Sequence, residues 1–403
     1  MIQDPIKWQM TAIRDPIHGY VKLDETARSL ADTVQMQRLR WIKQLGLANL
    51  VYPGANHTRF EHSLGAFHLA GLLAHHLGLD EDEQDEIRAA ALLHDVGHGP
   101  LSHATESVFA TYLREEHECV ADKLKSGELG EAISDHGLSP SRIQALIKGE
   151  TSLGQIVSGE IDVDRMDYLL RDAHYTGVAY GVVDYQRLIE KMTIRRGQLA
   201  VEAGGVHSAE SLLVSRLLMY PTVYFHHVSR IAQRMIQSGV LYMIEDRGWK
   251  PEKIRAMDDV GLIWAMKSET GYPAQIVERI TSRRLFKRAI YVSEENLGTP
   301  IREKETRIAE EIADAAGVDP LYVLVDNPSL PQIAEGNVPI WDGSESKPLR
   351  AVSPLVSIME RAHLAAWRFG IYTTEDQREA VEQAARRCLN IGRNPVQHTL
   401  QEL

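Results

Sequence analysis

Cysteine is nearly absent from this sequence of 403 residues, which has only two, Cys119 and Cys388. The two lie far apart and form no CxxC pair, so the sequence supports neither a disulfide framework nor a thiolate zinc site. This usage favours a reducing compartment, and we expect a cytoplasmic protein. The first residues, MIQDPIKWQMTAIRD, contain no apolar core of the kind found in signal peptides.

Long hydrophobic runs are also missing. The longest apolar stretch, LGAFHLAGLLAHHLGL, is interrupted by His68, His75 and His76 and is too short to span a bilayer. We interpret these three histidines as ordinary residues of a helix surface or core. The sequence therefore predicts a soluble protein with no membrane partner.

Positive charge is in deficit, because 44 lysines and arginines face 56 acidic residues and the net charge is -12. Binding to duplex nucleic acid depends on a cationic face that releases counterions, so we do not expect it here. An anionic small substrate would instead need particular arginines, lysines or a metal ion. The sequence also lacks a Walker A loop and a GxGxxG that follows a strand, which argues against nucleotide binding through those folds.

Helical periodicity dominates what is present. Alternation and turn signals in IRDPIHGYVKLD predict a short strand or hairpin, after which the pattern is helical from about residue 26 to 175. Three helices are expected in TARSLADTVQMQRLRWIKQLG, RFEHSLGAFHLAGLLAHHLG and DEDEQDEIRAAALLHDVGHG. A second hairpin is predicted over residues 193–205.

Three parts of the chain follow from these patterns: a helical body over residues 1–190, a helical extension over 191–300 and a small α/β region over 301–403. The last part holds the helical EKETRIAEEIADAAG, the strand-like LYVLVD, a further apolar strand and a final helix over 375–389. We predict a mainly α fold with a short N-terminal hairpin and a small C-terminal α/β appendage.

Metal-binding side chains gather around LLHDVGHGPLSH. His94 and Asp95 lie near a helix end, His62 lies in the neighbouring predicted helix, and Asp164 follows in EIDVDRMDYLLRDAHY. Two imidazoles and two carboxylates suit Mg, Mn, Fe, Co or Ni better than a closed tetrahedral zinc site, although Zn could occupy it after purification. Such a set leaves coordination positions open for water and substrate.

Further histidines recur beside this set. His98 is placed one helical turn after His94 on the same face, His103 follows the turn, and His117 lies in REEHE. A lone histidine is more often a hydrogen-bonded structural residue, and hydrogen bonding across the GHGPLSH turn is an alternative reading for His98 and His103. The recurrence favours a catalytic centre.

The segments NHTRFEHSLG, LLHDVGHGPLSH and IDVDRMDYLLRD resemble the signatures of the HD-domain phosphohydrolases, and specifically of their deoxynucleoside triphosphate triphosphohydrolase branch. The resemblance includes DPIHGYVKL and QRLRWIKQLG and weakens beyond about residue 290. It implies an HD-domain catalytic core over 1–190, an extension that completes the active site, and four metal ligands: His62, His94, Asp95 and Asp164.

The same resemblance implies hydrolysis of dNTPs to deoxynucleoside and inorganic triphosphate by water attack on the α-phosphorus. His98, His103 and His117 are then candidates for general acid–base catalysis. Glu106 stands where the family tends to have aspartate, which leaves its role open. The alternatives are a phosphohydrolase for another nucleotide phosphate ester and a nucleotide-binding oligomer with little turnover.

Substrate contacts are predicted on three segments. Arg59 shares a helical face with His62 and can offer its guanidinium to phosphate. The resemblance implies that Arg165, in place of a family lysine, contacts phosphate. The other implied contacts are Gln44 and Leu45 for sugar and base, Tyr168 and Asp172 along the helix of Asp164, Arg216 for phosphate, and Tyr224 on the 2' side of the sugar. Gln44 and Asp172 are expected to recognise the 3'-hydroxyl. Phe225 replaces a polar residue, so no base preference is carried over.

Members of this branch often form oligomers with nucleotides bound between subunits, so we expect a homo-oligomer, either a dimer or a tetramer. The matching positions for an activating GTP or dGTP are Asp32, Gln37, Arg40, Arg283 and Lys287. A family lysine is replaced by Thr11, and one lost charged hydrogen bond costs about 1.5 to 3 kcal/mol. SRRLFKR can equally be a solvated basic helix face.

Overall fold

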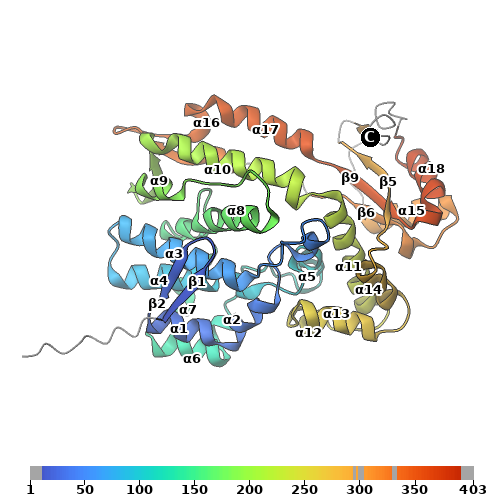
Figure 1. Ribbon diagram of the computed structural model, residues 1–403, viewed down its shortest axis with the longest axis horizontal. Helices are drawn as coiled ribbons and strands as arrows, with labels where there is room; N and C mark the ends of the chain where they lie inside the picture. The colour runs from blue at the N-terminus through green and yellow to red at the C-terminus, as the bar shows by residue number, and fades with distance from the viewer. Residues whose placement is uncertain (1–10, 294–295, 298–303, 329–333, 392–403) are drawn as a thin grey trace, which may run out of the picture.

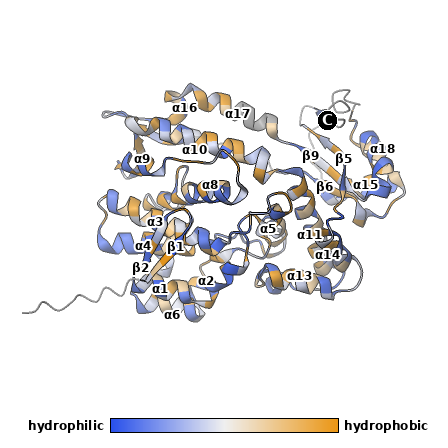
Figure 2. Ribbon diagram, viewed as in Figure 1, coloured by the Kyte–Doolittle hydropathy of each residue, from blue (hydrophilic) through white to orange (hydrophobic). Residues whose placement is uncertain are grey.

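The computed structural model describes residues 11–293, 296–297, 304–328 and 334–391. Helices dominate it and the strands are few and short, which confirms the predicted mainly α fold (Figure 1). Within the described ranges no helix is long and apolar enough to cross a membrane, and hydrophobic and hydrophilic residues are mixed along the helices in Figure 2.

The predicted N-terminal hairpin is confirmed and consists of the antiparallel strands β1 (Thr11–Asp15) and β2 (Gly19–Leu23). Asp15 Oδ1 accepts the backbone N–H groups of Ile17 and His18 at 2.9 and 2.8 Å, which closes the turn. Gly19 has φ +78°, a conformation that favours glycine. The DPIHG motif is therefore a tight turn that presents His18.

Three helices form the centre of the first helical body: α3 (Arg59–His76) packs between α4 (Glu81–Leu93) and α8 (Val163–Thr176). Reciprocal capping by Thr58 and Glu61 starts α3, and Asp80 and Glu83 start α4 in the same way. The other helices here are α5 (Ser102–Leu113), α6 (Gly127–Asp135), α7 (Pro140–Ile147) and α9 (Tyr185–Glu190).

The first predicted helix is not continuous in the structure. The stretch from Thr26 to Gly46 splits into α1 (Glu25–Asp32), α2 (Val34–Arg38) and the short turns η1 (Leu39–Trp41) and η2 (Gly46–Leu50). Thr33 has extended backbone dihedrals, and its hydroxyl donates to the Leu30 carbonyl oxygen. This side-chain bond competes with the helical backbone and ends α1.

The second part of the described chain begins with the predicted hairpin, β3 (Met192–Arg195) and β4 (Gln198–Glu202). Helix α10 (Val206–Met219) ends in a single π-helical turn, η7 (Tyr220–Tyr224), and α11 (His227–Glu245) follows. The helices after α11 are α12 (Pro251–Arg255), α13 (Asp259–Ser268) and α14 (Tyr272–Thr281). The π-helical turn was not predicted, and such turns are common at functional sites.

The C-terminal part contains a three-stranded antiparallel sheet, with β9 (Phe369–Thr373) between β5 (Lys287–Val292) and β6 (Leu324–Asp326). Helices α15 (Glu305–Ala316) and α18 (Arg378–Cys388) pack beside it (Figure 1). The remaining elements pack on the second part of the chain, where β7 pairs with β4 and α17 packs on α10. They are β7 (Pro339–Trp341), β8 (Ser346–Pro348), α16 (Leu349–Val352) and α17 (Pro354–Ala366).

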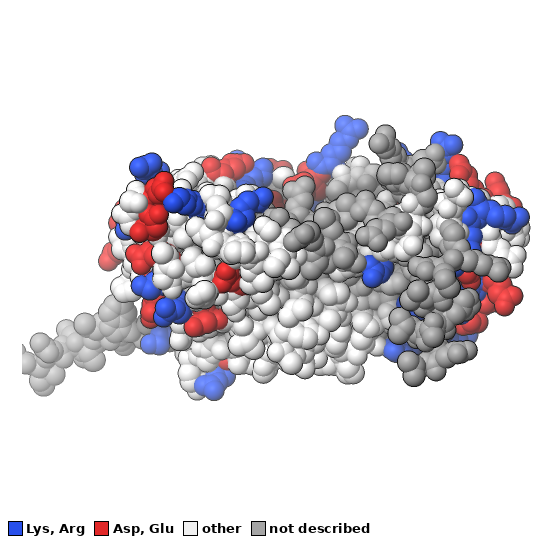
Figure 3. All heavy atoms as spheres, turned by 90° about the horizontal axis from the view of Figure 1, so that it is seen from above, with Lys and Arg blue, Asp and Glu red and all other residues white. Residues whose placement is uncertain are grey.

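The surface charge is mixed. On the face drawn in Figure 3, acidic and basic side chains are interspersed toward the two ends, and most of the centre carries neither charge. The described residues therefore form no continuous cationic field on this face.

Candidate active site

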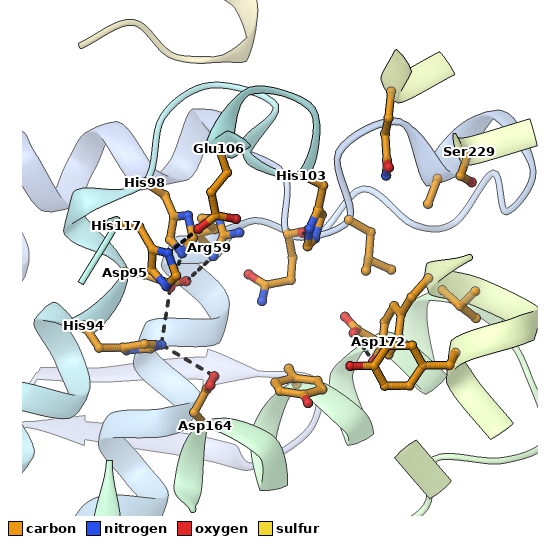
Figure 4. A pocket seen from close by; sticks show the side chains of 18 of the residues that line it. Arg59, His94, Asp95, His98, His103, Glu106, His117, Asp164, Asp172 and Ser229 are labelled. Atoms are coloured by element: carbon orange, nitrogen blue, oxygen red, sulfur yellow. Dashed lines mark hydrogen bonds and ion pairs between the residues drawn. The ribbon is translucent and has the colours of Figure 1, made fainter. Parts of the chain in front are cut away.

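The four predicted metal donors come from three separate elements. His62 lies on α3, His94 and Asp95 open the turn η3 (His94–Gly97), and Asp164 lies in the first turn of α8. One ligand atom each from His62, His94 and Asp95 lies within 4.8 Å of the others. Asp164 Oδ1 is 2.8 Å from His62 Nε2 and 3.6 Å from His94 Nε2 (Figure 4). The four donor groups converge as a divalent ion requires.

Hydrogen bonds behind these donors fix their orientation. The Nδ1–H group of His94 donates to the carbonyl oxygen of Ala91 at 2.8 Å, and that of His62 donates to Asp167 Oδ2 at 2.8 Å. Both bonds occupy Nδ1 and direct Nε2 toward the neighbouring donors. Nε2 is thus the ring atom that each imidazole can offer to a metal ion.

Asp167, the partner of His62, is itself tightly held. It accepts two bonds from the Arg171 guanidinium at 2.9 and 2.8 Å and one from His18 Nε2 at 2.7 Å, and Arg171 also binds Asp15 at 2.8 Å. Burial favours the neutral acid, but Arg171 holds the pKa of Asp167 well below its usual range. The N-terminal hairpin therefore supports His62 through a buried ionic network, a role that the sequence did not reveal.

Arg59 links the metal donors to the cavity wall. Its Nη1 donates to Asp95 Oδ2 at 2.8 Å, and its Nη2 donates to Ser102 Oγ at 2.6 Å. Asp95 Oδ1 lies 3.4 Å from His94 Nε2 and 3.2 Å from His98 Nε2. The guanidinium is thus oriented by two protein partners on the wall of the cavity.

The predicted helical relation between His94 and His98 is wrong, because α4 ends at Leu93 and His98 has extended backbone dihedrals. His98 nevertheless stacks on His117, with ring centroids 4.1 Å apart, and His117 Nδ1 forms an ion pair with Glu106. Burial and Arg59 lower the pKa of His98 to about 3. Against the effect of burial, Glu106 raises the pKa of His117, while the pKa of Glu106 falls to about 2.

His103 differs from His117 in its environment. Its Nε2–H donates to the carbonyl oxygen of Gln44 at 3.0 Å, and burial followed by Arg59 lowers its pKa. Of the three predicted acid–base histidines, only His117 has a pKa that is raised from its ordinary value, so it keeps its proton to higher pH than the other two.

The residues that were predicted to contact the sugar also lie close together. Asp172 Oδ2 accepts the hydroxyl of Tyr224 at 2.8 Å, and its Oδ1 lies 2.8 Å from His57 Nε2. Tyr224 belongs to the π-helical turn, and its ring lies 6.3 Å from that of Tyr168. Both aromatic rings line the cavity beside the metal donors.

A cavity of about 380 Å³ joins most of the predicted site residues. Those on its wall are Gln44, Leu45, Arg59, His94, Asp95, His98, His103, Glu106, His117, Asp164, Tyr168, Asp172 and Tyr224. His62 lies behind the wall. Arg165 and Arg216 are not part of it either: Arg165 turns back to Asp162, and Arg216 donates to the Tyr220 hydroxyl at 3.0 Å.

Several wall residues were not predicted as site residues, among them Tyr220, Phe225, Ser229, Arg230 and Gln233. Helical spacing in HHVSRIAQRM places Ser229 and Gln233 on one face, and that spacing is the signal that could have indicated them.

The predicted regulatory residues fall into two groups that share no pocket among the described residues. Arg40 Nε donates to Gln37 Oε1 at 2.8 Å near the end of α1, where Asp32 lies. Arg283 and Lys287 line a separate cavity of about 310 Å³ together with His227, Arg288 and Arg378.

Comparison with known proteins decides the family. An HD domain model matches residues 59–172, and an HD associated region model matches residues 183–400. This chain belongs to the HD-domain phosphohydrolase family. Its HD segment begins at Arg59 and ends at Asp172, so the metal donors and most of the cavity wall lie inside it.

Relatives extend along most of this HD-domain chain. An uncharacterised protein of Methanocaldococcus jannaschii is 36% identical over 91% of this chain and 80% of its own length. The deoxynucleoside triphosphate triphosphohydrolase SAMHD1 homologue of Dictyostelium discoideum is 32% identical over 78% of this chain and 66% of its own length. The human SAMHD1 enzyme is 30% identical over 76% of this chain, which spans 59% of the human protein.

Solved structures agree with this assignment. A hypothetical protein of Aquifex aeolicus superposes with a TM-score of 0.76 at 30% identity and covers 93% of this chain and 99% of its own. A phosphohydrolase of Bacteroides thetaiotaomicron superposes with a TM-score of 0.73 at 25% identity, over 91% of this chain and 100% of its own. The described residues thus share their fold with these two solved proteins.

Proposed function

We propose that this protein hydrolyses deoxynucleoside triphosphates to deoxynucleoside and inorganic triphosphate in a reaction that depends on a divalent metal ion. The observation that carries the proposal is one cavity with three of the four metal donors, the His117–Glu106 ion pair and the Asp172–Tyr224 pair on its wall. The names of the Dictyostelium and human relatives support this substrate class.

His62, His94, Asp95 and Asp164 would hold the metal ion. Bound there, the ion supplies neutralisation of phosphoryl oxygens and a water of lowered pKa that can attack the α-phosphorus. Arg59 adds positive potential on the same wall, and its bonds to Asp95 and Ser102 set its orientation before substrate binds.

His117 serves as the proton donor in this proposal. Hydrolysis releases a 5'-alkoxide, which needs a proton as the bond to the α-phosphorus breaks. Glu106 raises the pKa of the His117 imidazole, whereas the pKa values of His98 and His103 are lowered, so His117 is the histidine that best retains a proton to donate. The Nε2–H group of His103 is already bonded to the Gln44 carbonyl oxygen, so His103 acts by positioning the segment that carries Gln44.

Asp172 and Tyr224 recognise the sugar. Asp172 is held by His57 and the Tyr224 hydroxyl, and its carboxylate can accept a hydrogen bond from the 3'-hydroxyl. The Tyr224 ring occupies the 2' side, where a ribose hydroxyl would collide with it. This pair favours deoxyribose over ribose.

Product analysis tests the proposal. Purified protein is incubated with each dNTP and with GTP, singly and in mixtures, under magnesium or manganese, and the products are resolved by ion-exchange chromatography. Deoxynucleoside with intact triphosphate is the expected result, and it disappears in Asp164→Ala together with metal binding. Release of pyrophosphate or orthophosphate would instead indicate cleavage of a phosphoanhydride bond.

Regulation by a second nucleotide is a further part of the proposal. The cavity lined by Arg283, Lys287, Arg288 and Arg378 is strongly basic and fits the phosphates of an activating GTP or dGTP. Turnover that needs GTP, with a change of oligomer mass on GTP addition, is the expected result. Equal turnover and equal mass without GTP would assign SRRLFKR to an ordinary basic surface.

A further inference from the structure

The end of the cavity opposite the metal donors is built by the first turns of α11. Ser229, Arg230 and Gln233 line it, and we call these three residues the α11 end. In Figure 4, Ser229 lies across the cavity from His94 and Asp164, with His103 and Asp172 between them. A substrate that reacts at the metal donors and whose sugar is bound by Asp172 would direct its base toward the α11 end.

The α11 end has no unbalanced charge. Arg230 Nε donates to Asp326 Oδ2 at 3.1 Å, and its Nη2 donates to Asp326 Oδ1, so the two side chains form a bidentate ion pair. Asp326 also accepts the Tyr372 hydroxyl at 3.0 Å. Neutralised in this way, Arg230 offers little attraction to phosphate, and the α11 end suits an uncharged base.

The same contacts make the α11 end a hydrogen-bond donor. Arg230 Nη1 donates to Gln233 Oε1 at 3.4 Å, which orients the amide and leaves its NH₂ group as the donor open to a ligand. Ser229 is 1% exposed, and its hydroxyl finds no hydrogen-bond partner within the described residues. A buried hydroxyl without a partner on a cavity wall points to a ligand atom that completes its bonding.

We propose that Ser229 and Gln233 select the nucleobase by donating hydrogen bonds, and that they favour guanine over adenine. Guanine presents O6 and N7 as adjacent acceptors, whereas adenine places an amino donor at the position of O6. This selection rests on the proposed dNTP hydrolysis. A matched pair of contacts of this kind discriminates between bases by about tenfold or more.

Internal competition provides the test. The protein hydrolyses an equimolar mixture of dGTP and dATP, and the early ratio of deoxyguanosine to deoxyadenosine gives the ratio of their kcat/KM values. Both substrates meet the same enzyme population, so activation and partial unfolding cancel. We expect a ratio of about ten or more, and dITP, which keeps O6 and N7, should compete like dGTP. A ratio near one, or a preference for dATP, overturns the proposal.

Variants assign the selection to these side chains. Ser229→Ala and Gln233→Leu should each move the ratio toward one, and Gln233→Glu, which exchanges a donor for an acceptor, should move it toward dATP. Gln237→Leu is the matched control, because Gln237 lies one turn further along α11 and bonds Ser107 rather than lining the cavity. Ratios that stay at the parental value in Ser229→Ala and in both Gln233 variants contradict the assignment.

Failure of the proposed function gives a different result. If no dNTP is hydrolysed under any condition, equilibrium dialysis with dGTP and dATP reads the selection directly. Tighter binding of dGTP that weakens in Gln233→Leu supports base selection without the reaction, and equal binding of both nucleotides overturns it.

Discussion

Gly65 gives a sharp test of the network behind the metal donors. It lies on α3, three residues after His62, where Asp167 and Arg171 approach the helix closely. A Cβ atom at this position would lie 1.8 Å from Asp167 Oδ1 and 2.5 Å from Arg171 Nη2. Gly65→Ala must therefore displace the carboxylate that holds His62, although both side chains are fully buried.

The magnitude follows from opposing effects. Replacing glycine by alanine within a helix gains about 1 kcal/mol of helix propensity. Overpacking a buried site costs about 1 to 3 kcal/mol, and disruption of a buried ion pair costs about 3 to 5 kcal/mol. If the Asp167–Arg171 pair shifts without separating, only the overpacking cost applies, and after the gain in propensity we expect a net loss of up to about 2 kcal/mol in the free energy of unfolding. Displacement of Asp167 also releases His62, which should weaken metal binding by about tenfold to a hundredfold.

Two measurements check this prediction: urea unfolding at fixed excess manganese, and manganese affinity by competition with a chelating dye. Gly71→Ala is the matched control on the same helix, because its Cβ would meet Arg88 at an ordinary contact distance of 3.6 Å. The control should keep parental metal affinity and gain stability. Parental stability and affinity in Gly65→Ala would refute the role given to the network.

Three further predictions concern the cavity. Burial opposes the charged form of His117, but Glu106 raises its pKa, so His117 loses its proton only as the pH rises through that raised pKa. Glu106→Gln should therefore shift the alkaline limb of the kcat profile to lower pH. An unchanged limb would point to another proton donor. Tyr224→Ala should raise the ratio of GTP to dGTP hydrolysis by roughly tenfold, while Tyr224→Phe, which loses only the hydroxyl, should keep ribose excluded. Chelation of the metal should lower the free energy of unfolding by about 2.7 kcal/mol relative to metal at one hundred times its Kd, and a thermal shift that persists in Asp164→Ala would contradict the assigned donors.

Helical spacing accounts for the parts of the site that the sequence predicted well. Asp164, Tyr168 and Asp172 follow one another at intervals of four on α8, and all three line the cavity. Arg59 and His62 lie in the first turn of α3 as expected. Local periodicity fixes which face a side chain occupies once the helix is known, so these placements needed no tertiary information.

Tertiary contacts explain the differences. Arg165 was predicted to contact phosphate, but its guanidinium turns to Asp162 and the carbonyl oxygen of Gly159 at the start of α8. The link between His18 and His62 spans more than 40 residues and depends on the hairpin folding onto α3. Pairing of β7 with β4 likewise joins segments far apart in the chain. No local pattern encodes such contacts.

The C-terminal region completes the cavity from outside the HD segment. Arg230 lies on the wall, but its orientation depends on Asp326 of β6 and, through it, on Tyr372 of β9. A buried guanidinium without this carboxylate would be costly, so the wall and the small sheet stabilise one another. The sheet also contributes Lys287 and Arg288 of β5 to the basic cavity, where they meet His227 on the turn of α11 that precedes Arg230. Residues after 183 therefore line the same cavity as the HD segment, and the contacts of the small sheet with α11 hold that part of the cavity wall.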